Sequence, residues 1–173
     1  FWTKNPDPIV GYLNEIDQKG IHYYFQYTLN DYENEGFEPG VPLIEKRIET
    51  FCRLSEKLGK ARVIWRFDPL ILTHSLGVDE LLEKIRGIGD QIHAYTEKLV
   101  ISFVDIHAYR KVRNNLRNHH IDGREFDAQD RVELAQGLTA LNQSWKLKIS
   151  TCGETADLQI YGIGHNRCID DEL

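Results

Sequence analysis

Apolar positions along the chain recur alternately at the spacing of a strand and at the spacing of a helix. Residues 21–29 alternate apolar and polar side chains at every second position, which predicts a strand. Apolar residues within 44–58 recur every three or four positions, which predicts a helix that ends at Gly59. Residues 62–72 then predict a second strand, and Pro69 is expected to end its ladder.

The rest of the chain continues this alternation. The pattern first predicts a helix over residues 78–92, an almost wholly apolar strand over 99–105 and a basic helix over 107–118. A polar loop over 119–126, a helix capped by Asp127 and a strand over 146–151 are predicted next. At the front, residues 1–2 predict the end of an earlier strand, and residues 8–17 predict a short helix that ends at Gly20. The pattern therefore contains about five strands.

Strands that alternate with helices predict right-handed crossovers and a parallel sheet, so the fold class is α/β. No glycine-rich phosphate loop follows any of the strands, which disfavours a dinucleotide-binding sheet. We therefore predict parallel βα repeats that form most of a partial or complete TIM-like (β/α) barrel. No linker divides residues 1–173, which predicts one domain. Because the chain starts at Phe1 and contains no methionine, it is interpreted as an internal segment of a longer polypeptide.

Composition and charge narrow the function classes. The chain is 41% hydrophobic and 28% charged, as in ordinary globular proteins. Its net charge of -6 disfavours general nucleic-acid binding, and the basic cluster Arg110, Lys111, Arg113 and Arg117 is interpreted as a solvated helix face. No apolar run is long enough to cross a bilayer and no signal peptide is present, so we expect a cytoplasmic protein without membrane contact.

Three cysteines are too few, and odd in number, for a disulfide framework. Cys52 falls on the apolar stripe of a predicted helix and is interpreted as a core residue. Cys152 stands at a strand end and Cys168 in a polar segment near His165, so both thiols are expected at the mouth of the fold. Two isolated cysteines are, by themselves, a weak signal for a metal site.

In parallel α/β folds the functional site lies at the carboxyl ends of the strands. At those ends the sequence places Lys4, Asn5, Gln26, Thr28, Arg66, Asp68, Ser102, Asp105, Cys152 and Glu154. Buried charges such as Arg66 and Asp68 are costly without a partner or a ligand, which favours a lined pocket. The alternative is that strand ends are polar in general and that Arg66 pairs with a neighbouring carboxylate. No GxSxG, HExxH or P-loop motif is present.

Several sequence stretches together resemble one family. These are FWTKNPDP, HYYFQYTL, RIETFCRLSEKLGKARVIWRFDPLIL, VISFVD and the segment from CGE to YGIGHNRCIDDEL. They resemble the uncharacterised bacterial family called domain of unknown function 1848, over essentially the whole chain. The resemblance implies a partial or complete (β/α) barrel. It also implies further sequence at both ends, with a downstream cysteine-rich tail similar to the iron–sulfur motif of radical S-adenosylmethionine enzymes. It implies no established reaction.

The leading hypothesis is therefore an iron–sulfur, radical-type enzyme that acts on a small-molecule substrate. It would use a 4Fe-4S cluster and S-adenosylmethionine, with most cluster ligands outside this chain. The residues assigned to catalysis are Lys4, Arg66, Asp68, Asp105 and Glu154. The residues assigned to cofactor binding are Asn5, Gln26, Thr28, Ser102 and His165. The residues assigned to metal binding are Cys152 and Cys168.

Two other classes remain open. In the first, a divalent-metal-dependent hydrolase or isomerase, the cation would be held by Asp68, Asp105, Glu154 and His165. In the second, a non-catalytic module binds a small ligand or a partner protein in the same mouth. The sequence indicates neither the substrate nor the oligomeric state.

Overall fold

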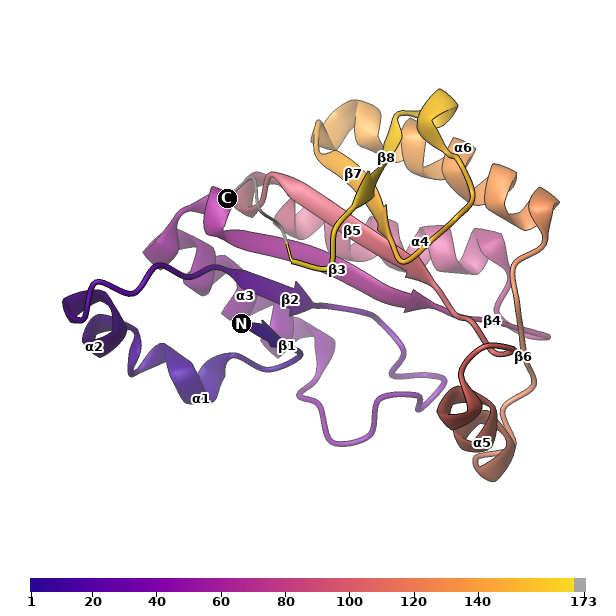
Figure 1. The fold of residues 1–173 in the computed structure, drawn as a ribbon, viewed down its shortest axis with the longest axis horizontal. Helices are drawn as coiled ribbons and strands as arrows, with labels where there is room; N and C mark the ends of the chain where they lie inside the picture. Colours follow the sequence, from indigo (N-terminus) through magenta and orange to yellow (C-terminus); the bar gives the residue numbers. More distant parts are fainter. Residues whose placement is uncertain (170–173) are drawn as a thin grey trace.

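The computed structural model describes residues 1–169, which fold around a six-stranded parallel sheet (Figure 1). The strands of this sheet, in spatial order, are β1 (Trp2–Thr3), β2 (Phe25–Thr28), β3 (Val63–Leu70), β5 (Lys98–Phe103), β7 (Lys148–Cys152) and β8 (Ile163–Asn166). Every neighbouring pair runs parallel. The predicted α/β class and parallel pairing are therefore confirmed.

Helices connect most of these strands. They are α1 (Asp7–Val10), α2 (Leu13–Gln18), α3 (Ile44–Leu58), α4 (Val78–Ile92), α5 (Arg110–Asn118) and α6 (Ala128–Trp145). Three short 3-10 helices lie at Lys60–Arg62, His93–Tyr95 and Gln159–Tyr161. Beyond the end of β3, strands β4 (Leu72–Thr73) and β6 (Gly123–Arg124) form a small antiparallel pair.

The spatial order of the strands follows their order along the chain, as it does in a barrel. The three long helices α3, α4 and α6 lie on the same side of the sheet (Figure 1). The sheet is nevertheless open, because β1 and β8 are its two edges and do not pair with each other. The part of the chain that the structure describes therefore has an open parallel sheet and does not show a closed barrel.

The two faces of the sheet differ in chemistry because successive side chains of a strand point to opposite sides. In β3, Val63, Trp65 and Phe67 are fully buried and belong to the main hydrophobic core with the helices. On the opposite face, which we call the inner face, Ile64 packs with Val100 and Cys152 in a second, small cluster. The inner face carries polar residues between these apolar ones, and it is where the site is built.

Four local features differ from the sequence-based expectations. Strand β2 begins at Phe25 and not at residue 21, although the alternating pattern extends further. Strand β3 continues through Pro69 to Leu70, with a register irregularity between Phe67 and Leu70. Strand β8 was not predicted, because it has four residues and an internal glycine that weakens the strand signal. The predicted helix over residues 8–17 is two short helices.

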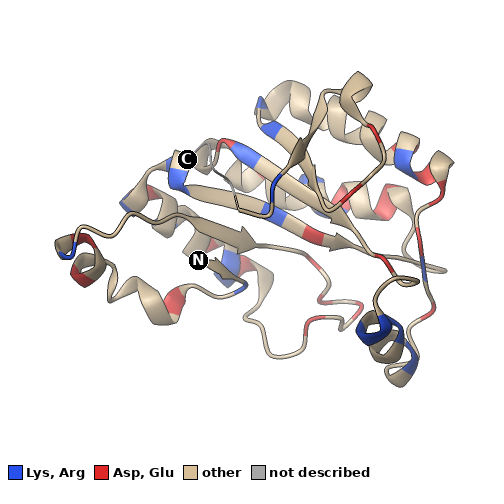
Figure 2. Cartoon of the chain, in the orientation of Figure 1, with Lys and Arg blue, Asp and Glu red and all other residues tan. Residues whose placement is uncertain are grey.

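Helix α5 carries a concentrated positive charge on the outside of the molecule (Figure 2). None of its residues is buried, and the guanidinium of Arg113 donates to the carbonyl oxygens of Ile106 and His107. The interpretation of the basic residues of α5 as a solvated face agrees with that exposure.

Cys52 is half-buried and packs against the main core, as predicted. Among the described residues, no helix combines the length and the apolar character needed to cross a bilayer.

Asp127 caps helix α6, as the sequence predicts. Its carboxylate accepts from the backbone N–H of Asp130 at 2.9 Å, and the carboxylate of Asp130 accepts from the N–H of Asp127 at 2.9 Å. The guanidinium of Arg124 also donates to Asp130, with Nη2 at 2.9 Å from Oδ1. These hydrogen bonds, that from Arg124 first, lower the pKa of Asp130. Strand β6 and the start of helix α6 are thereby joined through one buried carboxylate.

Substitution Asp130→Asn is expected to lower the free energy of unfolding by about 1 to 2 kcal/mol at neutral pH. Because the pKa of Asp130 is lowered in the folded state, its stabilisation is present above the unfolded value near 3.9 and is lost as pH falls through the folded value. The deficit of the variant should therefore shrink in acid. Urea unfolding of the variant and the unsubstituted protein at several pH values from 7 down to 2 tests this. Glu133→Gln, at an exposed position of the same helix, is the control. If the loss of stability in Asp130→Asn is the same at every pH, the stabilising role of the ionised Asp130 is contradicted.

Candidate functional site

The site is centred on Arg66, whose side chain is only 1% exposed on the inner face. Its Nη1 donates to Oε1 of Gln26 at 2.5 Å. Its Nε and Nη2 both donate to Oδ2 of Asp68, at 3.0 and 2.7 Å. The hydroxyl of Ser102 donates to the other carboxylate oxygen of Asp68. We call these four residues, Gln26, Arg66, Asp68 and Ser102, the Arg66 network.

Strand pairing brings this network together. Gln26 and Thr28 alternate on β2, Arg66 and Asp68 alternate on β3, and Thr28 stands opposite Arg66 in the register. Trp2 of β1 covers the network, with its ring centroid 4.2 Å from Cζ of Arg66 and its Nε1 donating to Oγ1 of Thr28 at 3.1 Å. The guanidinium therefore has a carboxylate, an amide and an aromatic face as partners, which compensates its removal from water.

The charge of Arg66 is retained in this environment. Burial opposes the charged form, but contacts with the thiol of Cys152 and the carboxylate of Asp68 outweigh burial, so the pKa of Arg66 is raised. A fixed cation with a paired carboxylate can orient neighbouring amide and hydroxyl groups without changing its own protonation. The network thus presents a preorganised polar surface on the inner face.

Two thiols lie beside this network. Sγ of Cys152, at the end of β7, is 3.5 Å from Sγ of Cys168, which follows β8. Nε2 of Gln26 donates to the carbonyl oxygen of Cys168 at 2.8 Å, so the segment after β8 crosses the inner face to reach β2 (Figure 1). The hydrogen bond with Cys152 raises the pKa of Cys168. The segment through Cys168 therefore covers part of the site.

Sequence reasoning missed Asn30, which is fully buried just beyond β2. Its side chain accepts from the backbone N–H of Asp68 at 2.9 Å and donates to the backbone carbonyl of Asp68 at 3.0 Å. It also donates to Glu38, which pairs with Lys4 at 2.5 Å. An asparagine directly after a buried strand was the available signal. Through these contacts Lys4 belongs to the border of the site and not to its centre.

The remaining predicted residues lie apart from the Arg66 network in local contacts. Asn5 accepts from the N–H of Asp7 at 3.2 Å, and Asp105 accepts from the N–H of Ala108 at 2.7 Å. Glu154 accepts from the N–H groups of residues 155 and 156, at 2.7 and 2.9 Å. Nδ1 of His165 lies 3.3 Å from Oγ1 of Thr151, on the face opposite to Cys152. The structure therefore brings together Gln26, Thr28, Arg66, Asp68, Ser102, Cys152 and Cys168.

The positions of the histidine, cysteine and carboxylate side chains decide whether several of them could bind one metal ion. Within residues 1–169 there is no group of three or more His, Cys, Asp or Glu side chains arranged to hold a metal ion. In particular, the four residues of the divalent-metal hypothesis do not share a centre. Asp105 and Glu154 are engaged in turns, and His165 contacts Thr151 on the face opposite to Cys152.

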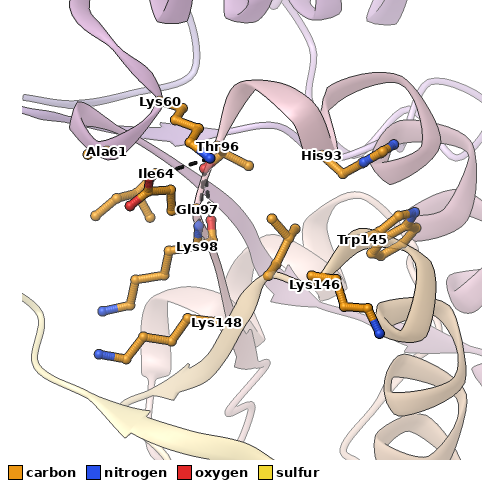
Figure 3. Close-up of a pocket in the computed structure, with 11 residues that line it drawn as sticks. Lys60, Ala61, Ile64, His93, Thr96, Glu97, Lys98, Trp145, Lys146 and Lys148 are labelled. Atoms are coloured by element: carbon orange, nitrogen blue, oxygen red, sulfur yellow. Dashed lines mark hydrogen bonds and ion pairs between the residues drawn. The ribbon is translucent and has the colours of Figure 1, made fainter.

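A cavity of about 540 Å³ lies elsewhere, at the amino-terminal ends of β3, β5 and β7 (Figure 3). It is lined by several lysines, but none of the predicted site residues contributes to it. Lys60 forms an ion pair with Glu97 at 3.6 Å. Lys98 and Lys148 extend side by side, whereas Lys146 points away from them (Figure 3). The lysines therefore do not converge on one point.

Fold and site together define an α/β protein with an open, chain-ordered parallel sheet, a helix-covered face and a polar inner face. The family model of Domain of unknown function (DUF1848) matches residues 1–173, and the chain belongs to that family. No curated protein and no solved structure matches the chain.

Proposed function

We propose that this protein is an iron–sulfur enzyme of the radical S-adenosylmethionine type, with the inner face of the sheet as the floor of its substrate pocket. The observation that carries the proposal is the convergence of the Arg66 network and two thiols on one face of a parallel sheet. The proposal includes completion of a barrel by strands outside the described residues. Polar strand ends gathered in this way are typical of active sites in parallel α/β enzymes.

The thiols near the site do not by themselves fit an iron–sulfur cluster. Such clusters are held by about four protein ligands, mostly cysteine thiolates. Among the described residues only Cys152 and Cys168 lie together, because Cys52 packs with the core on α3. The proposal therefore assigns most cluster ligands to the cysteine-rich tail that the family resemblance implies. When bound, the cluster would supply one-electron chemistry.

The residues of this chain have a different task in the proposal. Arg66 and Asp68 hold each other in place and thereby position the amide of Gln26 and the hydroxyl of Ser102. These polar groups would bind and orient a small polar substrate. The indole of Trp2 and the segment through Cys168 lie over the network and would exclude water from it.

Anaerobic purification of the natural full-length protein tests this function. We expect a brown protein with about four iron and four sulfide per chain, which cleaves S-adenosylmethionine when a strong reductant is added. A Cys52→Ser variant is the matched control and should keep its iron, because Cys52 lies on the helix side of the sheet. Iron-free protein after anaerobic reconstitution would contradict the proposal. If such protein still bound a small ligand, the site would be that of a binding module.

A further inference from the structure

Cys152 and Cys168 belong to the inner face on which the proposed function rests, but that function gives the two thiols no reaction with each other. The two residues are sixteen positions apart in sequence, and both thiols are free. Their sulfurs are 3.5 Å apart on the inner face, so a movement of about 1.5 Å would bring them to the length of a disulfide bond. Cys168 is exposed, whereas Cys152 is buried. Such a pair has one thiol that meets reagents from solution and a second thiol within reach of the first.

We propose that Cys152 and Cys168 are a site of reversible disulfide formation by exchange with a low-molecular-weight disulfide such as oxidised glutathione. The bond would fasten the segment after β8 to β7, across the inner face. This inference does not depend on the iron–sulfur proposal, because it concerns only two thiols and their neighbours.

The exchange has two steps. The thiolate of Cys168 attacks one sulfur of the oxidant, whose S–S bond breaks and releases one glutathione thiol. The thiolate of Cys152 then attacks the sulfur of Cys168 in this mixed disulfide and releases the second glutathione thiol. In total, two cysteine thiols lose two electrons and two protons, and one molecule of oxidised glutathione becomes two thiols.

One contact of Cys168 holds its thiol beside Cys152, and two others act on its thiolate in opposite directions. The carbonyl of Cys168 is held by Nε2 of Gln26 at 2.8 Å, which keeps the thiol over β7. The positive charge of Arg66 favours the thiolate of Cys168, although the hydrogen bond with Cys152 raises the pKa of Cys168 overall. In the joined state, neither sulfur can act as a thiolate ligand or reach a substrate.

The test uses the natural full-length protein, incubated anaerobically with oxidised glutathione in excess, quenched with an alkylating reagent and digested with trypsin. Cleavage after Lys148 and Arg167 places Cys152 and Cys168 on separate peptides, so a disulfide joins the peptide of residues 149–167 to the peptide that begins at Cys168. We expect this joined species, an about tenfold loss of alkylation at both cysteines, and recovery with dithiothreitol. Alkylation of Cys52, measured after unfolding, should not change.

Stability supplies a second readout. The disulfide should raise Tm by roughly 5 to 10 °C, because it closes a loop in the unfolded chain. The rise should persist in Cys52→Ser and disappear in Cys152→Ser and Cys168→Ser. If both cysteines stay alkylatable, or if Cys168 ends as a stable mixed disulfide with glutathione, the inference is wrong. Either result leaves the iron content of the protein, and so the proposed function, untouched.

Discussion

Substitution Asp68→Ala is expected to lower the free energy of unfolding by about 3 to 5 kcal/mol, as measured by urea unfolding at pH 7. Asp68 receives two hydrogen bonds from the guanidinium of Arg66, a side chain that is 1% exposed. Alanine would leave that buried cation without its counter-charge. The loss from Ser102→Ala should be smaller, about 1 kcal/mol, because only one hydrogen bond to the carboxylate disappears.

A double variant measures how strongly the contributions of Arg66 and Asp68 to stability depend on each other. If the cost of Asp68→Ala arises from the stranded guanidinium, Arg66→Leu in the same molecule should recover part of the lost stability. The two substitutions would then be strongly non-additive. Additive losses would show that Arg66 keeps sufficient partners when the carboxylate is absent, such as Gln26 and Trp2.

Substitution Gly89→Ala is expected to destabilise the protein by about 2 to 3 kcal/mol, although alanine favours helices. A Cβ atom at Gly89 of α4 would lie 2.4 Å from the ring of Trp145. That ring has little freedom to move, because its Nε1 donates to Asp90 at 2.9 Å and it packs against Trp65 with 6.1 Å between ring centroids. The methyl group would therefore separate α4 from α6.

The matched control lies two residues earlier on the same helix. A Cβ at Gly87 would meet nothing within 4 Å, so Gly87→Ala should stabilise the protein by about 0.5 to 1 kcal/mol. Thermal unfolding of both variants gives opposite signs if the close approach at Gly89 decides the result. Stabilisation by both substitutions would mean that the indole of Trp145 moves aside.

The sequence pattern predicted most elements because helical and strand periods are local properties of the chain. The stripe within residues 78–92 coincides with helix α4, and the cap at Asp127 is at the start of α6. Length was harder to predict at β2, where alternation began four residues before the strand does. Alternation reports side-chain polarity, whereas a strand ends where its neighbour no longer offers hydrogen bonds.

The candidate site residues differ in how far the structure brings them together, for a related reason. Gln26, Arg66 and Asp68 lie within paired strands, and the parallel register places their side chains next to one another. Asp105 and Glu154 stand in loops after the strands, and their carboxylates bind nearby backbone N–H groups. Position near a strand end could not reveal where a loop directs a side chain.

By itself, the sequence determined the alternation of strands and helices, the parallel class and the polar character of one end of each strand, because these follow from local periodicity. Tertiary structure alone decided that the sheet of the described residues is open, that Asn30 holds the backbone of Asp68, and that Cys152 meets Cys168. These features depend on pairing between segments distant in sequence, and no local pattern records such pairing.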